Sequence, residues 1–229
     1  MQKLCEDCTK CEVKIPIFSV LNSDEMAIIN RDRYSVLFRK GEVIIKQGTH
    51  ANFFLSLVSG FAKMYVEDTQ LKNLILKFLR PGTLVGGPGI HISDKYHYTV
   101  IAEEEARVCF IDKNNFKEVL YRNNNFLDKY LELSSQNYGR EIERMVSLSH
   151  KQMHGRIADA LLYMSDQIFE SNMITSQISR NDIADFTAMA KDSAIRILKE
   201  FERDNIISLD GRTIEILDSE RLRTISLSG

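Results

Sequence analysis

The sequence has few of the features that mark fibrous, membrane-spanning or exported chains. Its 229 residues include only three prolines and eleven glycines, which excludes collagen-like and Pro-rich linker classes. No run approaches the roughly 18 uncharged apolar residues that a membrane-spanning helix needs. The N-terminal segment is polar and lacks the apolar core of a signal peptide, so we expect a cytoplasmic protein without a membrane partner.

An excess of positive charge is also missing. The chain has 30 Lys and Arg residues against 32 Asp and Glu residues, which gives a formal net charge of −2. Neither residues 1–150 nor residues 151–229 have the basic excess that indicates nucleic-acid binding by composition. Any contact with DNA must therefore come from a local face.

Residues from about 34 to 111 predict a small antiparallel β-sandwich or barrel. Short β-type runs, such as Val43–Ile45 and residues 108–111, alternate with glycines. Several short strands at nearly even spacing, separated by turn signals, are typical of that architecture. Before them we expect a short helix with Ser23 as its N-cap.

A long helix is expected over about 126–150. Asp112 is expected to cap a shorter helix before it, and the asparagines at 123–125 to separate the two. Along the long helix, steps of 3 and 4 close to coiled-coil spacing connect Leu131, Ser134, Tyr138, Glu141 and Met145. We interpret this seam as a dimer interface, and a helix that lies on the β domain is the alternative.

The last third of the sequence predicts a winged helix-turn-helix. Residues 179–182 have the form of a capping box, and a short break at 187–189 leads into a second helix over about 190–204. Two β-type runs joined at Asp210 and Gly211 then form a hairpin with a type I′ turn signal.

The second of these helices separates apolar from charged residues. The side expected to be buried holds Ala194, Ile197, Leu198 and Phe201. The opposite side holds Asp192, Arg196, Lys199 and Arg203. A local basic strip suits phosphate and base-edge contact, so we expect this face to bind DNA rather than to be an ordinary solvated surface.

Five segments carry a likeness to a known family, namely residues 40–48, 54–60, 81–86, 155–158 and 183–198. They resemble the CRP/FNR family of bacterial transcription regulators, over nearly the whole chain. The resemblance implies an α+β fold. It consists of an N-terminal antiparallel β-roll of the cyclic-nucleotide-binding, jelly-roll type (1–111), a long dimerisation helix (112–150) and a C-terminal winged helix-turn-helix (151–229). It also implies a homodimer that binds a palindromic double-stranded operator and RNA polymerase.

The resemblance assigns the operator-reading positions to Lys191, Asp192, Ser193 and Arg196. An acid there suits a cytosine amino group, and an arginine can pair with guanine through two hydrogen bonds. Two positions depart from the family pattern: Ala188 replaces the usual turn glycine and Ala190 replaces the usual Ser or Thr cap.

The same resemblance argues against cyclic AMP as the ligand. In the cyclic-AMP-binding branch a glutamate holds the ribose and an arginine neutralises the cyclic phosphate. The matching stretches here read Gly-Gly-Pro-Gly at 86–89 and His-Tyr-Thr at 97–99, so both contacts are lost.

The four cysteines indicate a different signal. In a cytosolic chain they are more often metal ligands or thiols than disulfides. Cys5, Cys8 and Cys109 match the FNR-like branch, which holds an oxygen-sensitive [4Fe–4S] cluster, whereas Cys11 follows Cys8 more closely than is usual. We expect such a cluster on Cys5, Cys8, Cys11 and Cys109, sensing oxygen, redox state or nitric oxide. A zinc site, a thiol–disulfide switch, or no metal with another effector are the alternatives.

Signatures of catalysis are missing as well. The sequence has no evident nucleophile–base pair, phosphate loop or paired acid–base carboxylates, so we do not expect an enzyme. A ligand-binding module that does not contact DNA is the alternative class of function.

Overall fold

The computed structural model describes residues 11, 13, 15–67, 73–86, 90, 92–175 and 177–229. Its internal contacts divide the chain into two compact units, which are described separately below. The first contains residues 1–66 and 78–137, and the second contains residues 67–77 and 138–229. The boundary at residue 137 falls within the long helix α3 (Asn124–His150).

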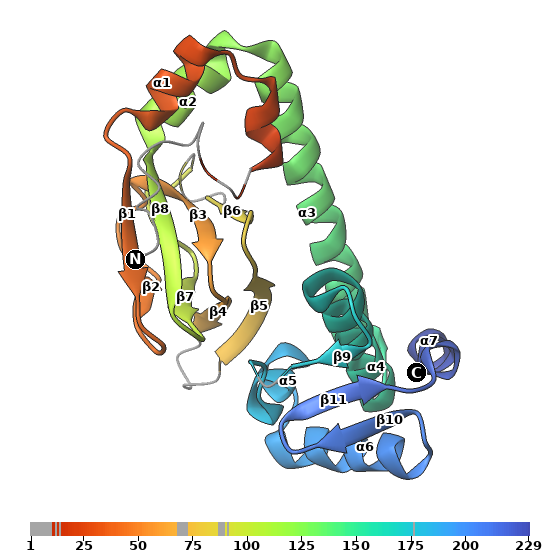
Figure 1. Cartoon of the computed structure of the whole chain (residues 1–229). Helices are drawn as coiled ribbons and strands as arrows, with labels where there is room; N and C mark the ends of the chain where they lie inside the picture. The colour runs from red at the N-terminus through yellow and green to blue at the C-terminus, as the bar shows by residue number, and fades with distance from the viewer. Residues whose placement is uncertain are drawn as a thin grey trace. The chain divides into compact units, whose positions relative to one another are not determined.

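The β-roll consists of two four-stranded sheets, seen as two layers in Figure 1, and belongs to the first unit except for its residues within 67–77, which the internal contacts assign to the second. The strand orders are β1-β8-β3-β6 and β2-β7-β4-β5. The strands are β1 (Tyr34–Phe38), β2 (Val43–Ile45), β3 (Phe53–Ser59), β4 (Ala62–Glu67), β5 (Asn73–Leu79), β6 (Leu84–Val85), β7 (Thr99–Ala102) and β8 (Ala106–Asp112). The helical segments are the 3₁₀ helix η2 (Pro16–Val20), α1 (Ser23–Asn30) and α2 (Lys113–Arg122). The predicted antiparallel β-roll is confirmed.

Side-chain caps determine where the first two α-helices begin. Asp112 caps α2 as predicted, because its carboxylate accepts hydrogen bonds from the backbone N–H groups of Asn114 and Asn115. The expected cap of α1 was wrong by one residue. Asn22 is the cap, since its side chain and that of Glu25 each accept a 2.9 Å hydrogen bond from the other's backbone N–H. Only this register places a glutamate at the third helical position, where a capping box closes.

An aromatic cluster forms the core between β3, α2 and the first turns of α3. The ring of Phe116 stacks on that of Phe54 with centroids 3.9 Å apart. Phe126 and Tyr130 of α3 lie 5.2 Å and 5.7 Å from the Phe116 ring. Phe54, Phe116 and Phe126 are at most 1% exposed. Each such burial contributes roughly 1.5–3 kcal/mol, so the cluster fixes the start of α3 on the roll.

The second unit is a winged helix-turn-helix, which confirms the prediction for this part of the chain. Its elements are α4 (Met153–Tyr163), the π-helix η4 (Met164–Phe169), β9 (Met173–Ile174), α5 (Arg180–Phe186), α6 (Lys191–Arg203), β10 (Ile207–Asp210), β11 (Thr213–Ile216) and α7 (Ser219–Ser228). The three strands form one antiparallel sheet in the order β10-β11-β9. Because Asp210 pairs with Thr213, the hairpin loop is Gly211 and Arg212, one residue later than expected.

The turn between α5 and α6 keeps its shape without the usual glycine. Ser179 and Asp182 form the predicted capping box at the start of α5. At the other end of α5, Ala188 has a φ of +52°. This left-handed conformation costs an L-residue about 1 kcal/mol relative to glycine. The next residue, Met189, donates its backbone N–H to the carbonyl of Ala184 at 2.9 Å, which holds the turn closed.

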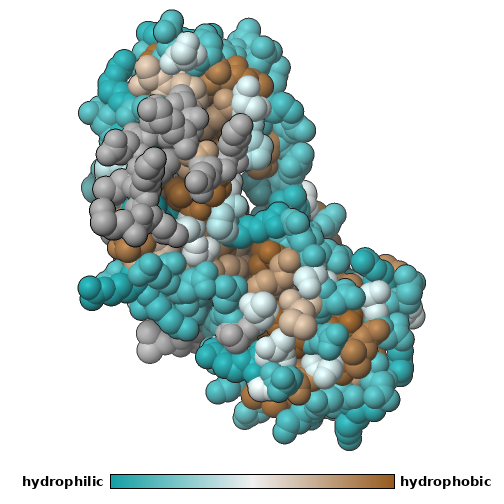
Figure 2. Space-filling model, viewed as in Figure 1, coloured by the Kyte–Doolittle hydropathy of each residue, from teal (hydrophilic) through white to brown (hydrophobic). Residues whose placement is uncertain are grey.

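No helix in the described ranges is long and apolar enough to cross a membrane. Figure 2 shows hydrophilic residues over most of the visible face, with hydrophobic residues reaching the surface in separate patches.

We predict that Ala188→Gly stabilises the protein. Glycine adopts positive φ without a steric penalty, so the free energy of unfolding should rise by about 1 kcal/mol in urea denaturation followed by circular dichroism. Ala188→Val is the matched control and should lower it, because a β-branched residue is poorly tolerated at positive φ. An equal or lower stability of Ala188→Gly would show that the turn is not strained at this position.

Candidate nucleic-acid interface

Helix α6 buries the face that the sequence predicts. Ala194, Ile197, Leu198 and Phe201 are each at most 2% exposed. They lie on the side of α6 that contacts α4, α5 and β10. The packing of this apolar face determines which side chains of α6 reach solvent.

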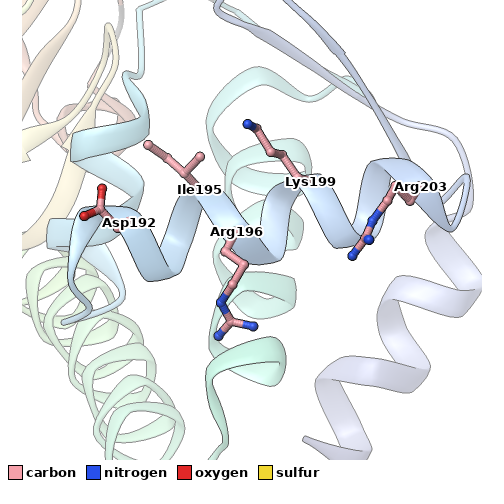
Figure 3. Close-up of a pocket in the computed structure, with 5 residues that line it drawn as sticks. All are labelled: Asp192, Ile195, Arg196, Lys199 and Arg203. Carbon is pink, nitrogen blue, oxygen red and sulfur yellow. The ribbon is translucent and has the colours of Figure 1, made fainter.

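The opposite face carries the predicted DNA-contacting residues. A shallow surface groove along α6 is lined by Asp192, Ile195, Arg196, Lys199 and Arg203 (Figure 3). Lys191 is exposed and Ser193 is half-buried in the first turn of the helix. In Figure 3, Arg196 and Lys199 point to opposite sides of α6. The helix is about 20 Å long, and the major groove of B-DNA is wide enough to admit an α-helix.

Arg196 forms an ion pair with Glu200 of the same helix. Its Nη1 donates a 2.8 Å hydrogen bond to Oε1 of Glu200, one turn further along α6. The other oxygen of Glu200, Oε2, lies 2.7 Å from Nε2 of His154 on α4. The hydrogen bond from His154, supported by the charge of Arg196, lowers the pKa of the Glu200 carboxyl. The Arg196 guanidinium, which is expected to contact a base, is therefore hydrogen-bonded to the ionised carboxylate of Glu200.

The wing is attached to the first helix of the motif. Arg180, at the start of α5, points its Nη2 at the carbonyl oxygens of Gly211 and Thr213, each 3.4 Å away. Burial lowers the pKa of the Arg180 guanidinium from its usual value. These contacts hold the β10–β11 hairpin beside α5.

Two polar contacts connect the second half of α3 to the helices that carry the motif. The Arg144 guanidinium lies 4.1 Å above the ring of Phe186 at the end of α5 and donates a 2.9 Å hydrogen bond to its carbonyl. Asp159 of α4 accepts 2.5 Å hydrogen bonds from Ser147 of α3 and Ser226 of α7. Helices α3, α4, α5 and α7 are therefore joined by specific bonds within this unit.

The predicted metal ligands are only partly described. Cys5 and Cys8 lie outside the described residues. Cys109 on β8 is buried, and Cys11 is half-buried. Nη1 of Arg33 donates a 3.0 Å hydrogen bond to Sγ of Cys109. Within the described part of the chain, no three His, Cys, Asp or Glu side chains are grouped to hold a metal ion.

The predicted dimer seam lies on the surface of α3. Leu131, Tyr138 and Met145 are seven residues apart and are 51%, 68% and 58% exposed, and Ser134 and Glu141 are exposed beside them. Large apolar side chains exposed at heptad spacing are typical of helix interfaces, and the dimer interface stays a prediction. Ile142, 41% exposed, belongs to the same stripe and was missed by the strict 3,4 spacing of the seam.

Sequence reasoning also missed Glu200, His154 and Arg180. Glu200 stands four residues after Arg196, a spacing at which side chains on a helix meet, so the sequence contained a signal for this pair. His154 and Arg180 meet their partners 46 and more than 30 residues away. Such contacts depend on the fold and leave no local pattern.

Comparison with known proteins identifies both parts of the chain. Residues 35–123 match the family model of the cyclic nucleotide-binding domain, and residues 155–225 match the Crp-like helix-turn-helix domain. The transcriptional activator protein Anr of Pseudomonas aeruginosa is 26% identical, over 96% of this chain and 91% of its own length. The transcriptional activator protein FnrA of Stutzerimonas stutzeri is 25% identical, over 95% and 90%.

Among solved structures, FixK2 from Bradyrhizobium japonicum superposes with a TM-score of 0.77 at 20% identity, covering 84% of this chain and 96% of FixK2. This likeness supports the fold. The matched relatives are transcription regulators, and the chain is accordingly not an enzyme. Because the two domain models together match residues 35–123 and 155–225, and the likeness to the activators runs over nearly the full length, the chain belongs to the CRP/FNR family of DNA-binding transcription regulators.

Proposed function

We propose that this regulator is a homodimer that binds palindromic double-stranded operator DNA, acts with RNA polymerase, and responds to oxygen or redox state. The observation that carries the DNA-binding part is the division of α6 into a buried apolar face and an exposed face with Arg196, Lys199 and Arg203. Base edges are read by Arg196 with Lys191, Asp192 and Ser193, and phosphates are bound by Lys199 and Arg203.

The dimer is proposed to form through the exposed stripe of α3. Two copies related by a two-fold axis would bury Leu131, Tyr138, Ile142 and Met145 of each chain, with Ser134 and Glu141 at the edge of the contact. A two-fold dimer places two recognition helices about one turn of DNA apart, which is the reason for a palindromic operator. The relatives' family supports this arrangement, because CRP/FNR regulators bind DNA as dimers.

The sensing part rests on the cysteines. Cys5, Cys8, Cys11 and Cys109 are proposed to hold a [4Fe–4S] cluster, which would supply sensitivity to oxygen or nitric oxide, and four thiolates are a suitable donor set for it. The Arg33 guanidinium at 3.0 Å from Sγ of Cys109 supports a ligand role, because a cation there offsets the negative charge of a thiolate ligand. The likeness to activators such as FnrA supports the same branch.

Four alternatives differ from this proposal in chemistry. A zinc site uses the same thiolates, a thiol–disulfide switch uses them without metal, and a small-molecule effector leaves them unused. A ligand-binding module that does not contact DNA is disfavoured by the basic face of α6. Cyclic AMP is disfavoured as the ligand because the sequence has neither the expected glutamate at 86–89 nor the expected arginine at 97–99. Residues 87–89 lie outside the described residues.

We predict that Arg196→Ala loses base discrimination, whereas Lys199→Ala weakens binding to all sequences alike. A base contact contributes about 1–3 kcal/mol of discrimination, and a phosphate contact contributes salt-dependent affinity. Fluorescence anisotropy with a duplex selected by the parent protein, its guanine-substituted forms and a scrambled duplex measures both effects. Equal losses on all duplexes for Arg196→Ala would make Arg196 a phosphate contact, and a parent that binds no duplex would disprove DNA binding.

We predict that Met145→Glu disrupts the dimer. Closing the seam would bury an added carboxylate on each chain, which should reduce the association constant by at least about tenfold. Gln136→Glu adds the same charge at an exposed position on the opposite side of α3 and is the matched control. Sedimentation equilibrium should give twice 26.4 kDa for the parent and the control, and a smaller mass for Met145→Glu. An unchanged dimer would place the interface elsewhere.

We predict that anaerobically purified protein contains iron and sulfide at about four atoms each per chain, with broad visible absorption that air bleaches. Cys109→Ser should lose the metal, whereas Ser35→Ala, at the position opposite Cys109 on β1, should retain it. Zinc in place of iron would support the alternative metal site. Protein that is free of both metals after anaerobic preparation would contradict a metal cofactor.

A further inference from the structure

One carboxylate bridges two helices beside the proposed base-reading arginine. Glu200 accepts from Arg196 of its own helix at 2.8 Å through Oε1 and contacts His154 of α4 at 2.7 Å through Oε2. The Glu200 side chain is only 25% exposed, whereas the Arg196 side chain is 55% exposed. Glu200 is therefore the more buried partner of the pair, and Arg196 is the more exposed one.

The contact of Glu200 with His154 affects the ion pair between Glu200 and Arg196. An ion pair one turn apart is weaker when the cation precedes the acid, as it does here, because both charges then oppose the helix dipole. Alone, the Arg196–Glu200 pair would exchange among rotamers. His154 removes that freedom from Glu200, and its ring also packs 6.0 Å from the ring of Phe201 in the buried face of α6. The acceptor offered to Arg196 is thus held in a fixed place.

The pair with Glu200 uses one of the donors of Arg196. Glu200 engages Nη1, and the guanidinium keeps further N–H groups in a rigid fork. Because Glu200 already holds Nη1, the Arg196 guanidinium loses less conformational freedom when it forms two hydrogen bonds with the acceptors on the guanine edge. Accurate readout needs such support from side chains that do not themselves touch the base.

We propose that Glu200 is a positioning residue that sets base discrimination by Arg196, and that His154 holds Glu200 in place. This inference rests on the proposed function, because it assigns a role within the same DNA-reading surface. The Glu200 carboxylate adds negative charge near the DNA, so it also lowers affinity for phosphates in general. Both effects raise the ratio of specific to non-specific affinity.

The test is a double-mutant cycle on the full-length protein. A duplex selected by the parent from a random pool is compared with the same duplex carrying a substitution at the guanine that Arg196 reads. The variants are Glu200→Ala, Glu200→Gln, His154→Ala, Arg196→Ala and the double variant. Glu202→Ala is the matched control, because it removes the same charge from an exposed position of α6 without touching the pair. Thermal unfolding of each variant shows whether the fold is kept.

Glu200→Ala should lower the ratio of the two dissociation constants on the order of tenfold and should bind the scrambled duplex no more weakly than the parent. Glu200→Gln, which keeps Oε1 as an acceptor, should retain most of the ratio. His154→Ala should lower the ratio to an intermediate value, and Glu202→Ala should leave it unchanged. In the Arg196→Ala background, Glu200→Ala should have no further effect on the ratio.

Three outcomes for the ratio would overturn the inference, and so would a general loss of affinity together with lower thermal stability. The three outcomes are an unchanged ratio in Glu200→Ala, the same loss in Glu202→Ala, or an equal further loss in the Arg196→Ala background. A loss of affinity for all duplexes together with a lower melting temperature would give Glu200 a purely structural role, which also overturns it. If the parent protein selects no DNA sequence from the random pool, the proposed function itself is disproved. If the parent discriminates between the two duplexes and any of the results above is found, only this inference is disproved.

Discussion

The direction in which the charged face of helix α6 points depends on how the apolar face of the helix is buried. Four apolar residues on one side of a thirteen-residue helix must leave water, and this requirement fixes the rotation of the helix about its own axis. Once that rotation is fixed, Arg196, Lys199 and Arg203 have to face outward. The basic strip is therefore a consequence of core packing, and a chain with a net charge of −2 can still offer a cationic face.

That constraint explains which features could be predicted from the sequence. The apolar face of α6, the cap at Asp112 and the capping box at Ser179 and Asp182 are local patterns, and the structure confirms them. The helix start at Asn22 and the hairpin loop at Gly211 and Arg212 each differed by one residue. In both cases hydrogen bonding across several residues decided between two adjacent candidates of similar local preference.

The features that could not be predicted are those made between distant segments. His154 reaches Glu200 only because α4 packs on α6, and Arg180 reaches the wing only because the β10–β11 hairpin lies beside α5. Ala188 is an intermediate case. The sequence showed that the turn glycine is missing, but only the structure shows that the backbone keeps a positive φ in spite of it. The fold here overrides the preference of the residue.

Within the first unit, the buried cysteine is connected to the start of helix α3 by continuous packing. Cys109 lies on β8, which pairs with β3 and ends at Asp112, the cap of α2. Phe116 of α2 stacks on Phe54 of β3 and contacts Phe126 and Tyr130 of α3. A displacement of β8 must therefore be taken up by a close-packed aromatic cluster, which yields by changing its packing rather than by compressing. The start of α3 belongs to this cluster through Phe126 and Tyr130.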